Sequence, residues 1–210
     1  MNSVQFGNYD SYDDFSLFLA SKEIGTAEPK KKIVEVEGSD GVLDFTEYFG
    51  DVKYNNRTLK MDFSLIHSDL LGQYSSIQDA IHGKKMNISF SEDSGFYYVG
   101  RITVEPFTKE KNIGRFSITA DCDPYKYKTN ETIVTQSVSG SKTITLTNSR
   151  KRVVPTITTN AEMSFTFGAT TVTHTAGTFI IPELELVEGN NTIKVAGTGN
   201  VSFKYREGRL

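Results

Sequence analysis

The chain of 210 residues has one cysteine, no tryptophan and no long hydrophobic run. A single cysteine, Cys122, excludes an intramolecular disulfide framework. No stretch approaches the roughly 18 apolar residues that a membrane-spanning helix needs. The first fifteen residues lack the basic and apolar regions of a signal peptide. These absences predict a soluble protein that is made in a cytoplasm and has no membrane partner.

A basic surface is also missing. The net charge is −3 and the isoelectric point is about 5.7, so the electrostatic footprint of a sequence-specific nucleic-acid binder is absent. The only dense basic runs are Lys30–Lys32 and Arg150–Arg152. Short lysine-rich runs commonly protect exposed strand edges, and we interpret both as solvated edges or turns.

The three histidines, His67, His82 and His174, do not form a metal-binding pattern. A metal site needs histidine or cysteine at close spacing on one face, together with a third ligand. We therefore expect surface or capping histidines. Strand alternation turns Cys122 inward, where a free cysteine behaves as a small hydrophobic residue, and no partner base can be nominated to make it a nucleophile.

Residues 36–51 contain glycines and acids, but no known catalytic arrangement. Gly38 and Gly41 are not followed by the Gly-Lys-Ser/Thr of a phosphate loop. Asp40, Asp44 and Glu47 do not have the spacing of an EF-hand, although a weak cation site is an alternative. The sequence predicts no catalytic residue, no metal and no cofactor, and hence a protein that is not an enzyme.

Alternation with a period of two residues dominates the first half of the chain. In residues 59–65 apolar side chains alternate with polar ones, and the pattern returns in residues 86–90, 96–104 and 116–122. Short turns rich in Gly, Asn, Asp and Ser separate these segments. This pattern is typical of antiparallel hairpins with one buried face, so the fold class is mainly β.

Residues 68–82 instead follow a helical period. Leu70, Tyr74, Ile77 and Ile81 recur at spacings of three and four, which places them on one helical face. Ser68 is the predicted N-cap and Gly83 the predicted C′ residue. Residues 12–20 fit either a strand or a helical turn, and we favour a strand.

From residue 129 the sequence becomes threonine-rich, with short strands such as 143–146 and 165–167 separated by regular turns. Such spacing is typical of a β-sandwich or jelly roll. We therefore expect two domains, at residues 1–128 and 129–210. The first is mainly β with the one helix, and the second is a β-sandwich or jelly roll.

Several motifs, in order, resemble one family. VEGSDGVLDFTEYFG is similar to a Val-Pro-Gly-x-Asp-Gly-x-Leu-Asp loop, with Glu37 where proline is common, and YNNRTLKMDF is similar to a Tyr-x-Asn-Arg strand. The hairpin MNISFSEDSGFYYVGRITV, the exit DCDPYKY and the C-terminal run from Ile180 follow. The chain thus resembles the distal tail protein (Dit) family of long-tailed, siphovirus-type phages, especially those of Gram-positive hosts.

This resemblance implies an architecture and a set of partners. Six N-terminal β-sandwich domains, each with one α-helix, form a ring, from which galectin-like C-terminal β-sandwiches (jelly rolls) project. The homohexamer is a hub in the virion tail tip that joins the tail tube protein to the tail-associated lysin or fibre protein and to receptor-binding proteins. DNA passes through its bore without sequence-specific binding. The chain is short for the family, which implies that other proteins carry receptor binding.

Within this frame, residues 36–63 supply the candidate site. Gly38 to Gly41 allow a tight turn, and aromatic residues there suit a protein interface. Acidic residues keep a pore-facing or rim surface from holding DNA. The alternative is that the aromatics complete the core of their own domain. The candidate ring-interface or loop residues are Asp40, Asp44, Phe45, Glu47, Tyr48, Phe49 and Arg57.

Two other functions stay open from the sequence alone. One is a carbohydrate-binding module of a phage adhesion device, because galectin-like sandwiches bind sugars. The absence of tryptophan and the inward alternation of Phe165, Phe203 and Tyr205 weaken this hypothesis. The other is a tail-tube or related tail structural subunit, which would stack into long polymers where a hub stops at one or two rings.

Overall fold

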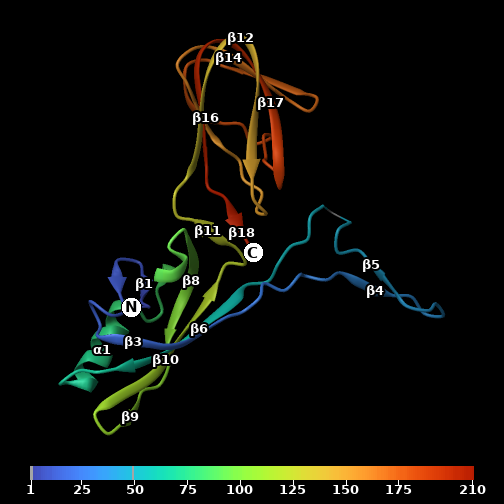
Figure 1. Ribbon diagram of the computed structural model, residues 1–210. Helices are drawn as coiled ribbons and strands as arrows, with labels where there is room; N and C mark the ends of the chain where they lie inside the picture. The colour runs from blue at the N-terminus through green and yellow to red at the C-terminus, as the bar shows by residue number, and fades with distance from the viewer. Residues whose placement is uncertain (1, 49) are drawn as a thin grey trace. The chain divides into compact units, whose positions relative to one another are not determined.

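The computed structural model describes residues 2–48 and 50–210. The chain divides into two compact units, one of residues 1–126 with residue 210 and one of residues 127–209. Each contains its own hydrophobic core. The described residues are mainly β-strand with one α-helix (Figure 1), which confirms the predicted fold class.

The first unit is a curved antiparallel sheet with strand order β2-β1-β7-β8-β10-β6-β3, to which β9 adds beside β10. The strands of this sheet are β1 (Val4–Phe6), β2 (Tyr9–Asp10), β3 (Leu17–Ile24), β6 (Arg57–Leu65), β7 (Lys85–Phe90), β8 (Phe96–Val104), β9 (Thr108–Glu110) and β10 (Ile113–Cys122). A short 3-10 helix, η1 (Ser91–Asp93), joins β7 to β8.

The predicted alternation positions the core of this unit. Along β6 every second residue is buried, from Arg57 to Leu65, and β10 pairs with all nine residues of that strand. Met61 and Phe63 are packed with Ile118 and Phe116 of β10 in one apolar cluster. Cys122 is buried in the same cluster, as the alternation predicted.

The helix α1 (Leu70–Ile81) buries Leu70, Ile77 and Ile81 in this core. Ser68 is not its N-cap, because the Asp69 carboxylate accepts the hydrogen bond from the Gly72 backbone N–H at 2.9 Å. A Cβ at position 72 would lie 2.1 Å from that carboxylate, so the glycine that weakens the helix makes room for its cap. Gly83 follows the C-cap with φ +74°, as predicted.

The segment at residues 12–20 is only partly a strand. Residues 11–15 form turns, and β3 begins at Leu17. The Asp10 carboxylate explains the difference, because it accepts hydrogen bonds from the backbone N–H groups of Tyr12 and Asp13. Such side-chain bonds compete with a strand ladder.

The second unit is a six-stranded antiparallel sheet with strand order β15-β14-β17-β13-β16, with β12 along the other edge of β17. Its strands are β12 (Thr132–Asn148), β13 (Thr156–Thr159), β14 (Met163–Phe167), β15 (Thr170–His174), β16 (Gly177–Ile180) and β17 (Gly189–Tyr205). β11 (Lys126–Lys128) and β18 (Gly208–Arg209) pair with each other where the chain enters and leaves this unit.

A bend in the long β12–β17 ladder divides this sheet into two layers. Gly140 and Gly197 lie opposite each other at the bend with φ +79° and +145°, a backbone region that glycine adopts readily. On one side of it β17 pairs with β14, and on the other side it pairs with β13. The two halves enclose a core that includes Phe165, Ile193 and Phe203.

Candidate functional site

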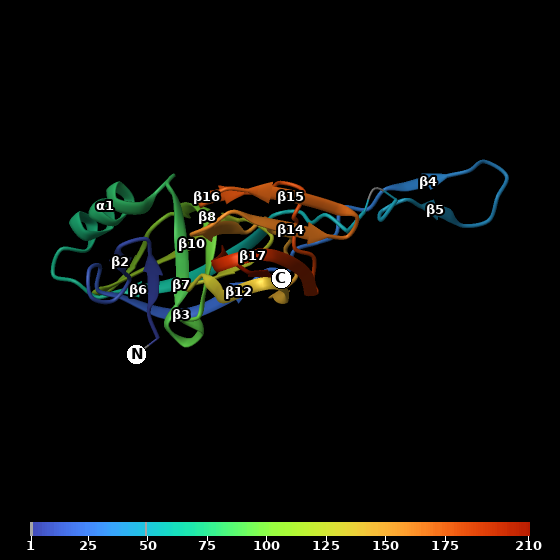
Figure 2. The ribbon, with the colours of Figure 1, turned by 90° about the horizontal axis from the view of Figure 1, so that it is seen from above.

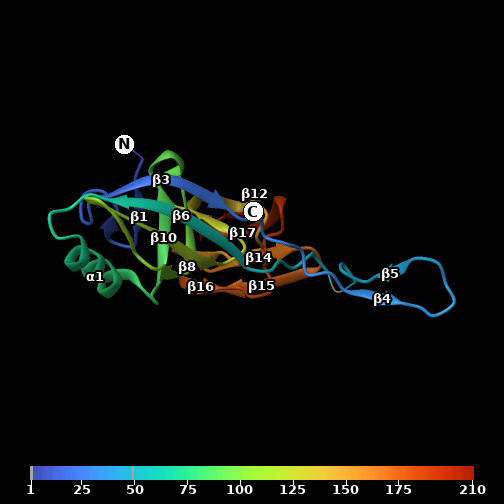
Figure 3. The same cartoon turned by 90° about the horizontal axis from the view of Figure 1, so that it is seen from below.

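Residues 28–55 leave the sheet of the first unit between β3 and β6 and form a hairpin that we call the arm (Figures 2 and 3). Its distal part is a separate two-stranded sheet of β4 (Ile33–Glu35) and β5 (Val42–Asp44). At its root, the Lys30 N–H donates to the Lys53 carbonyl at 2.7 Å and the Asn55 N–H donates to the Glu28 carbonyl at 2.8 Å. Backbone pairing thus holds the arm as one projecting element.

The arm exposes apolar side chains on both of its faces. Val34 lies opposite Leu43, while Ile33 lies opposite Asp44 and Glu35 opposite Val42. All four apolar residues of these pairs are exposed, and so are Val36 and Tyr48. An isolated two-stranded hairpin is marginally stable in water, and exposed apolar strands with free edges are templates for another chain. The arm is therefore a candidate interaction site.

The sequence-predicted residues fall mainly on this arm. Asp40 lies in the exposed turn between β4 and β5, where Gly38 and Gly41 have φ +81° and +76°. These values match the expected role of the two glycines. Phe49 lies outside the described residues.

Phe45 and Tyr48 follow β5 and form an edge-to-face ring pair at 5.8 Å. The side chain of Tyr48 is 71% exposed, and neither ring belongs to the core of the first unit. For these two residues the alternative of a role in the core of their own domain is wrong.

Asp44 has a local structural role. Its carboxylate accepts a hydrogen bond from the Thr46 N–H at 2.8 Å, and the Thr46 hydroxyl accepts one from the Lys32 N–H at 3.1 Å. The hydrogen bonds with Thr46 lower the pKa of Asp44 below its ordinary value. This turn fixes the path of the chain where it leaves β5.

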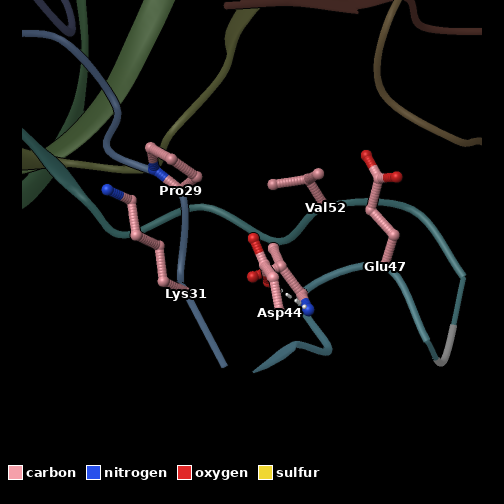
Figure 4. A pocket seen from close by; sticks show the side chains of 6 residues that line it. Pro29, Lys31, Asp44, Glu47 and Val52 are labelled. Carbon is pink, nitrogen blue, oxygen red and sulfur yellow. Dashed lines mark hydrogen bonds between the residues drawn. The ribbon is translucent and has the colours of Figure 1, made fainter. Parts of the chain in front are cut away.

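An open hollow of ≈ 420 Å³ lies beside this turn. Figure 4 shows Asp44 in the middle of it, with Lys31 and Glu47 on opposite sides. Among the described residues, no group of three His, Cys, Asp or Glu side chains is placed to hold a metal ion. The hollow offers mixed charge on an open surface, which suits contact with a protein better than enclosure of a small molecule.

Arg57 differs from the other candidates because it is buried. It is the first residue of β6, directly after the arm, and only 7% of it is exposed. Its guanidinium carbon lies 5.8 Å from the centre of the Tyr98 ring. The sequence pattern placed Arg57 among the loop and interface residues, whereas its side chain points into the interior with Leu59 and Met61.

Two histidines and the cysteine, which the sequence offered as reactive groups, make structural contacts in this fold. The ring nitrogen Nδ1 of His82 accepts a hydrogen bond from the Val104 N–H at 3.0 Å, and the His174 ring stacks on Phe179 at 4.0 Å. Burial raises the pKa of the Cys122 thiol to about 12, which opposes formation of the reactive thiolate.

No helix in the described part of the chain combines the length and the hydropathy that crossing a membrane requires. The fold is instead that of a two-unit β protein with a projecting hairpin arm. No protein-family model matches the sequence, and no curated protein matches it.

A solved structure does match the fold. The chain is similar to the SPP1 Dit (gp 19.1) protein, which is described as a paradigm of the hub adsorption apparatus in phages that infect Gram-positive bacteria. The TM-score is 0.71 at 17% sequence identity, and the match covers 98% of this chain and 99% of that chain. The resemblance to Dit seen in the motifs therefore extends to the fold of the whole chain.

Proposed function

We propose that this protein is a phage distal tail structural protein, a homohexameric hub in the virion tail tip. The observation that carries the proposal is the likeness in fold to the SPP1 Dit protein over nearly the full length of both chains. In this role the hub joins the tail tube protein to the baseplate or tip, where the tail-associated lysin or fibre protein and the receptor-binding protein attach. The protein itself performs no catalysis.

The arm supports assembly from many copies. Six of its described apolar side chains are 44–71% exposed within their own chain, and burial of apolar surface is the dominant favourable term in association. An arm that projects from one copy and packs on another makes a heterologous contact, which closes into a ring when the rotation permits. The candidate residues Asp40, Asp44, Phe45, Glu47 and Tyr48 then lie in or beside the ring interface.

The first test is the mass of the purified protein in solution by light scattering coupled to gel filtration. We expect six times the chain mass of 23.4 kDa, or a trimer that becomes a hexamer as the concentration rises. A protein that stays monomeric at high concentration, both alone and with the tail tube protein, contradicts the hub. Glycan binding by the second unit is then the next property to measure.

A matched control removes the arm and keeps the sheet. Replacing residues 31–52 with Asn-Gly closes the hairpin at the paired residues Lys30 and Lys53, because Asn-Gly favours a two-residue hairpin turn. We expect this variant to be folded by circular dichroism and monomeric at every concentration. A shortened protein that still forms hexamers shows that the arm is not the assembly element.

A further inference from the structure

The Arg57 side chain is a buried cation without an ion-pair partner among the described residues. It is 7% exposed, and its Nε atom is enclosed without a hydrogen-bond partner. Among residues 2–48 and 50–210, no carboxylate forms an ion pair with it. Buried charges in proteins are normally paired, because an unpaired buried charge is costly. The Tyr98 ring supplies a cation–π contact but accepts no strong hydrogen bond.

The two acids that flank the ladder partner of Arg57 are engaged with other residues. Asp121 and Asp123 flank Cys122, which lies opposite Arg57 in the β6–β10 ladder. The Asn56 side-chain amide donates to Asp121 at 3.1 Å, and the Lys85 ammonium donates to Asp123 at 3.2 Å. Only Nε is fully enclosed without a partner, and no hydrogen bond of the described residues engages the terminal Nη groups, so these groups keep what little exposed surface the side chain has.

The tip of the arm carries the matching charge. Glu37 and Asp40 lie on either side of Ser39 in the turn between β4 and β5, and both are exposed. No hydrogen bond or ion pair of the described residues engages either side chain. The ten residues from the root at Pro29 to the tip span about 33 Å when extended, so the tip reaches well beyond the root of its own arm.

We infer that Arg57 is a binding site for a carboxylate, and that the acidic arm tip of a second copy, through Glu37 or Asp40, supplies it. Arginine is suited to this task because its planar fork binds carboxylates through two parallel hydrogen bonds. The inference deepens the proposed function and rests on it. A tip that binds the root of the next copy's arm makes a head-to-tail contact, which repeats around a ring.

The test compares stability with assembly in the full-length chain. Arg57→Met removes an unpaired buried charge and keeps the volume similar, so the melting temperature of the dilute monomer stays unchanged or rises. Assembly, measured by light scattering against concentration, weakens at least tenfold. The double variant Glu37→Gln/Asp40→Asn weakens assembly to the same extent, and combining it with Arg57→Met adds little further loss. Glu35→Gln, on β4 rather than in the turn, is the matched acidic control and leaves assembly unchanged.

Other outcomes overturn the inference. If Arg57→Met lowers the monomer melting temperature and assembly together, while the acidic variants assemble normally, Arg57 has only a structural role. If acetate at constant ionic strength raises the melting temperature of the wild type but not of Arg57→Met, and the acidic variants assemble normally, the ligand is a free anion and the arm tip is not its source. A wild type that never assembles refutes the hub itself, and the acetate titration then still tests Arg57 as a carboxylate site.

Discussion

The arm and the sheet of the first unit both contain paired strands with apolar residues, but they differ in how far those residues are buried. Leu43 of β5 is 51% exposed, whereas Phe63 of β6 is 2% exposed, although both are apolar residues of paired antiparallel strands. The sheet has eight main strands and a helix to bury one face, and the arm has only its own two strands. Burial within the chain therefore stabilises the sheet, while the apolar side chains of β4 and β5 stay 44–53% exposed, a surface that under the proposed function a partner covers.

The largest expected effect on stability comes from truncating a buried residue of the sheet. Phe63 packs edge-to-face on Phe6 at 6.3 Å in the core of the first unit. Truncation to alanine removes its buried area and leaves a cavity, so we expect Phe63→Ala to lower the free energy of unfolding by about 3–5 kcal/mol. Urea denaturation followed by circular dichroism measures this change. A loss below about 1 kcal/mol would show that the core closes around the missing ring.

The second prediction contrasts a carboxylate that its own chain satisfies with the free acids of the arm tip. Glu207 is 13% exposed and accepts hydrogen bonds from the Thr132 hydroxyl at 2.6 Å, the Ser149 hydroxyl at 2.6 Å and the Lys128 ammonium at 3.0 Å. Although burial opposes the shift, these hydrogen bonds lower the pKa of Glu207 to about 2. At neutral pH, Glu207→Gln should cost about 1–3 kcal/mol.

The pH dependence of the Glu207→Gln variant tests whether the ionised carboxylate stabilises the fold. Because the folded-state pKa of Glu207 is depressed, its contribution is fully present above the ordinary value of 4.5 and is lost as the pH falls towards 2. Unfolding curves of the wild type and of Glu207→Gln should therefore differ at pH 7 and converge at low pH. A difference that is constant with pH would contradict the role of the charge.

The third prediction concerns the end of the helix. The Asp69 carboxylate satisfies one of the backbone N–H groups that a helix N-terminus leaves without an intrahelical partner. Asp69→Ala should lower the free energy of unfolding by about 1 kcal/mol. Ser68→Ala is the matched control and should have little effect, because Asp69 provides the cap. Thermal unfolding of both variants checks this, and equal losses would contradict the assignment.

The strands of the sheet were predictable because their core imposes a pattern on the sequence. In β6 and β10 burial alternates with a period of two residues, so Leu59, Met61 and Phe63 mark the strand without further information. The helix was found for the same reason, from its buried face. Its N-cap was misplaced by one residue because Ser68 and Asp69 are both good caps, and only the hydrogen bond to Gly72 distinguishes them.

The arm was only partly predictable, because its residues do not pack in a hydrophobic core of their own chain that would impose a periodic pattern. The glycines of its turn were identified, but Ile33–Glu35 and Val42–Asp44 do not alternate with one buried face, so their pairing left no clear periodicity. The burial of Arg57 was missed because a charged residue after a polar turn suggests a surface loop. Arg57 instead begins the buried face that continues with Leu59 and Met61 along β6, while its place at an interface stays a prediction.

The smallest expected effect on stability is also the one that tests the comparison most directly. Leu43→Ser removes an exposed apolar side chain that lies opposite Val34 in the arm. Surface substitutions of this kind usually change the free energy of unfolding by less than about 0.5 kcal/mol, so urea denaturation of the dilute monomer should hardly change. Assembly should weaken, because a polar hydroxyl replaces apolar area that a partner would bury. If Leu43→Ser destabilises the monomer as strongly as Phe63→Ala, the arm packs within its own chain, and the division between a self-sufficient sheet and a partner-dependent arm is wrong.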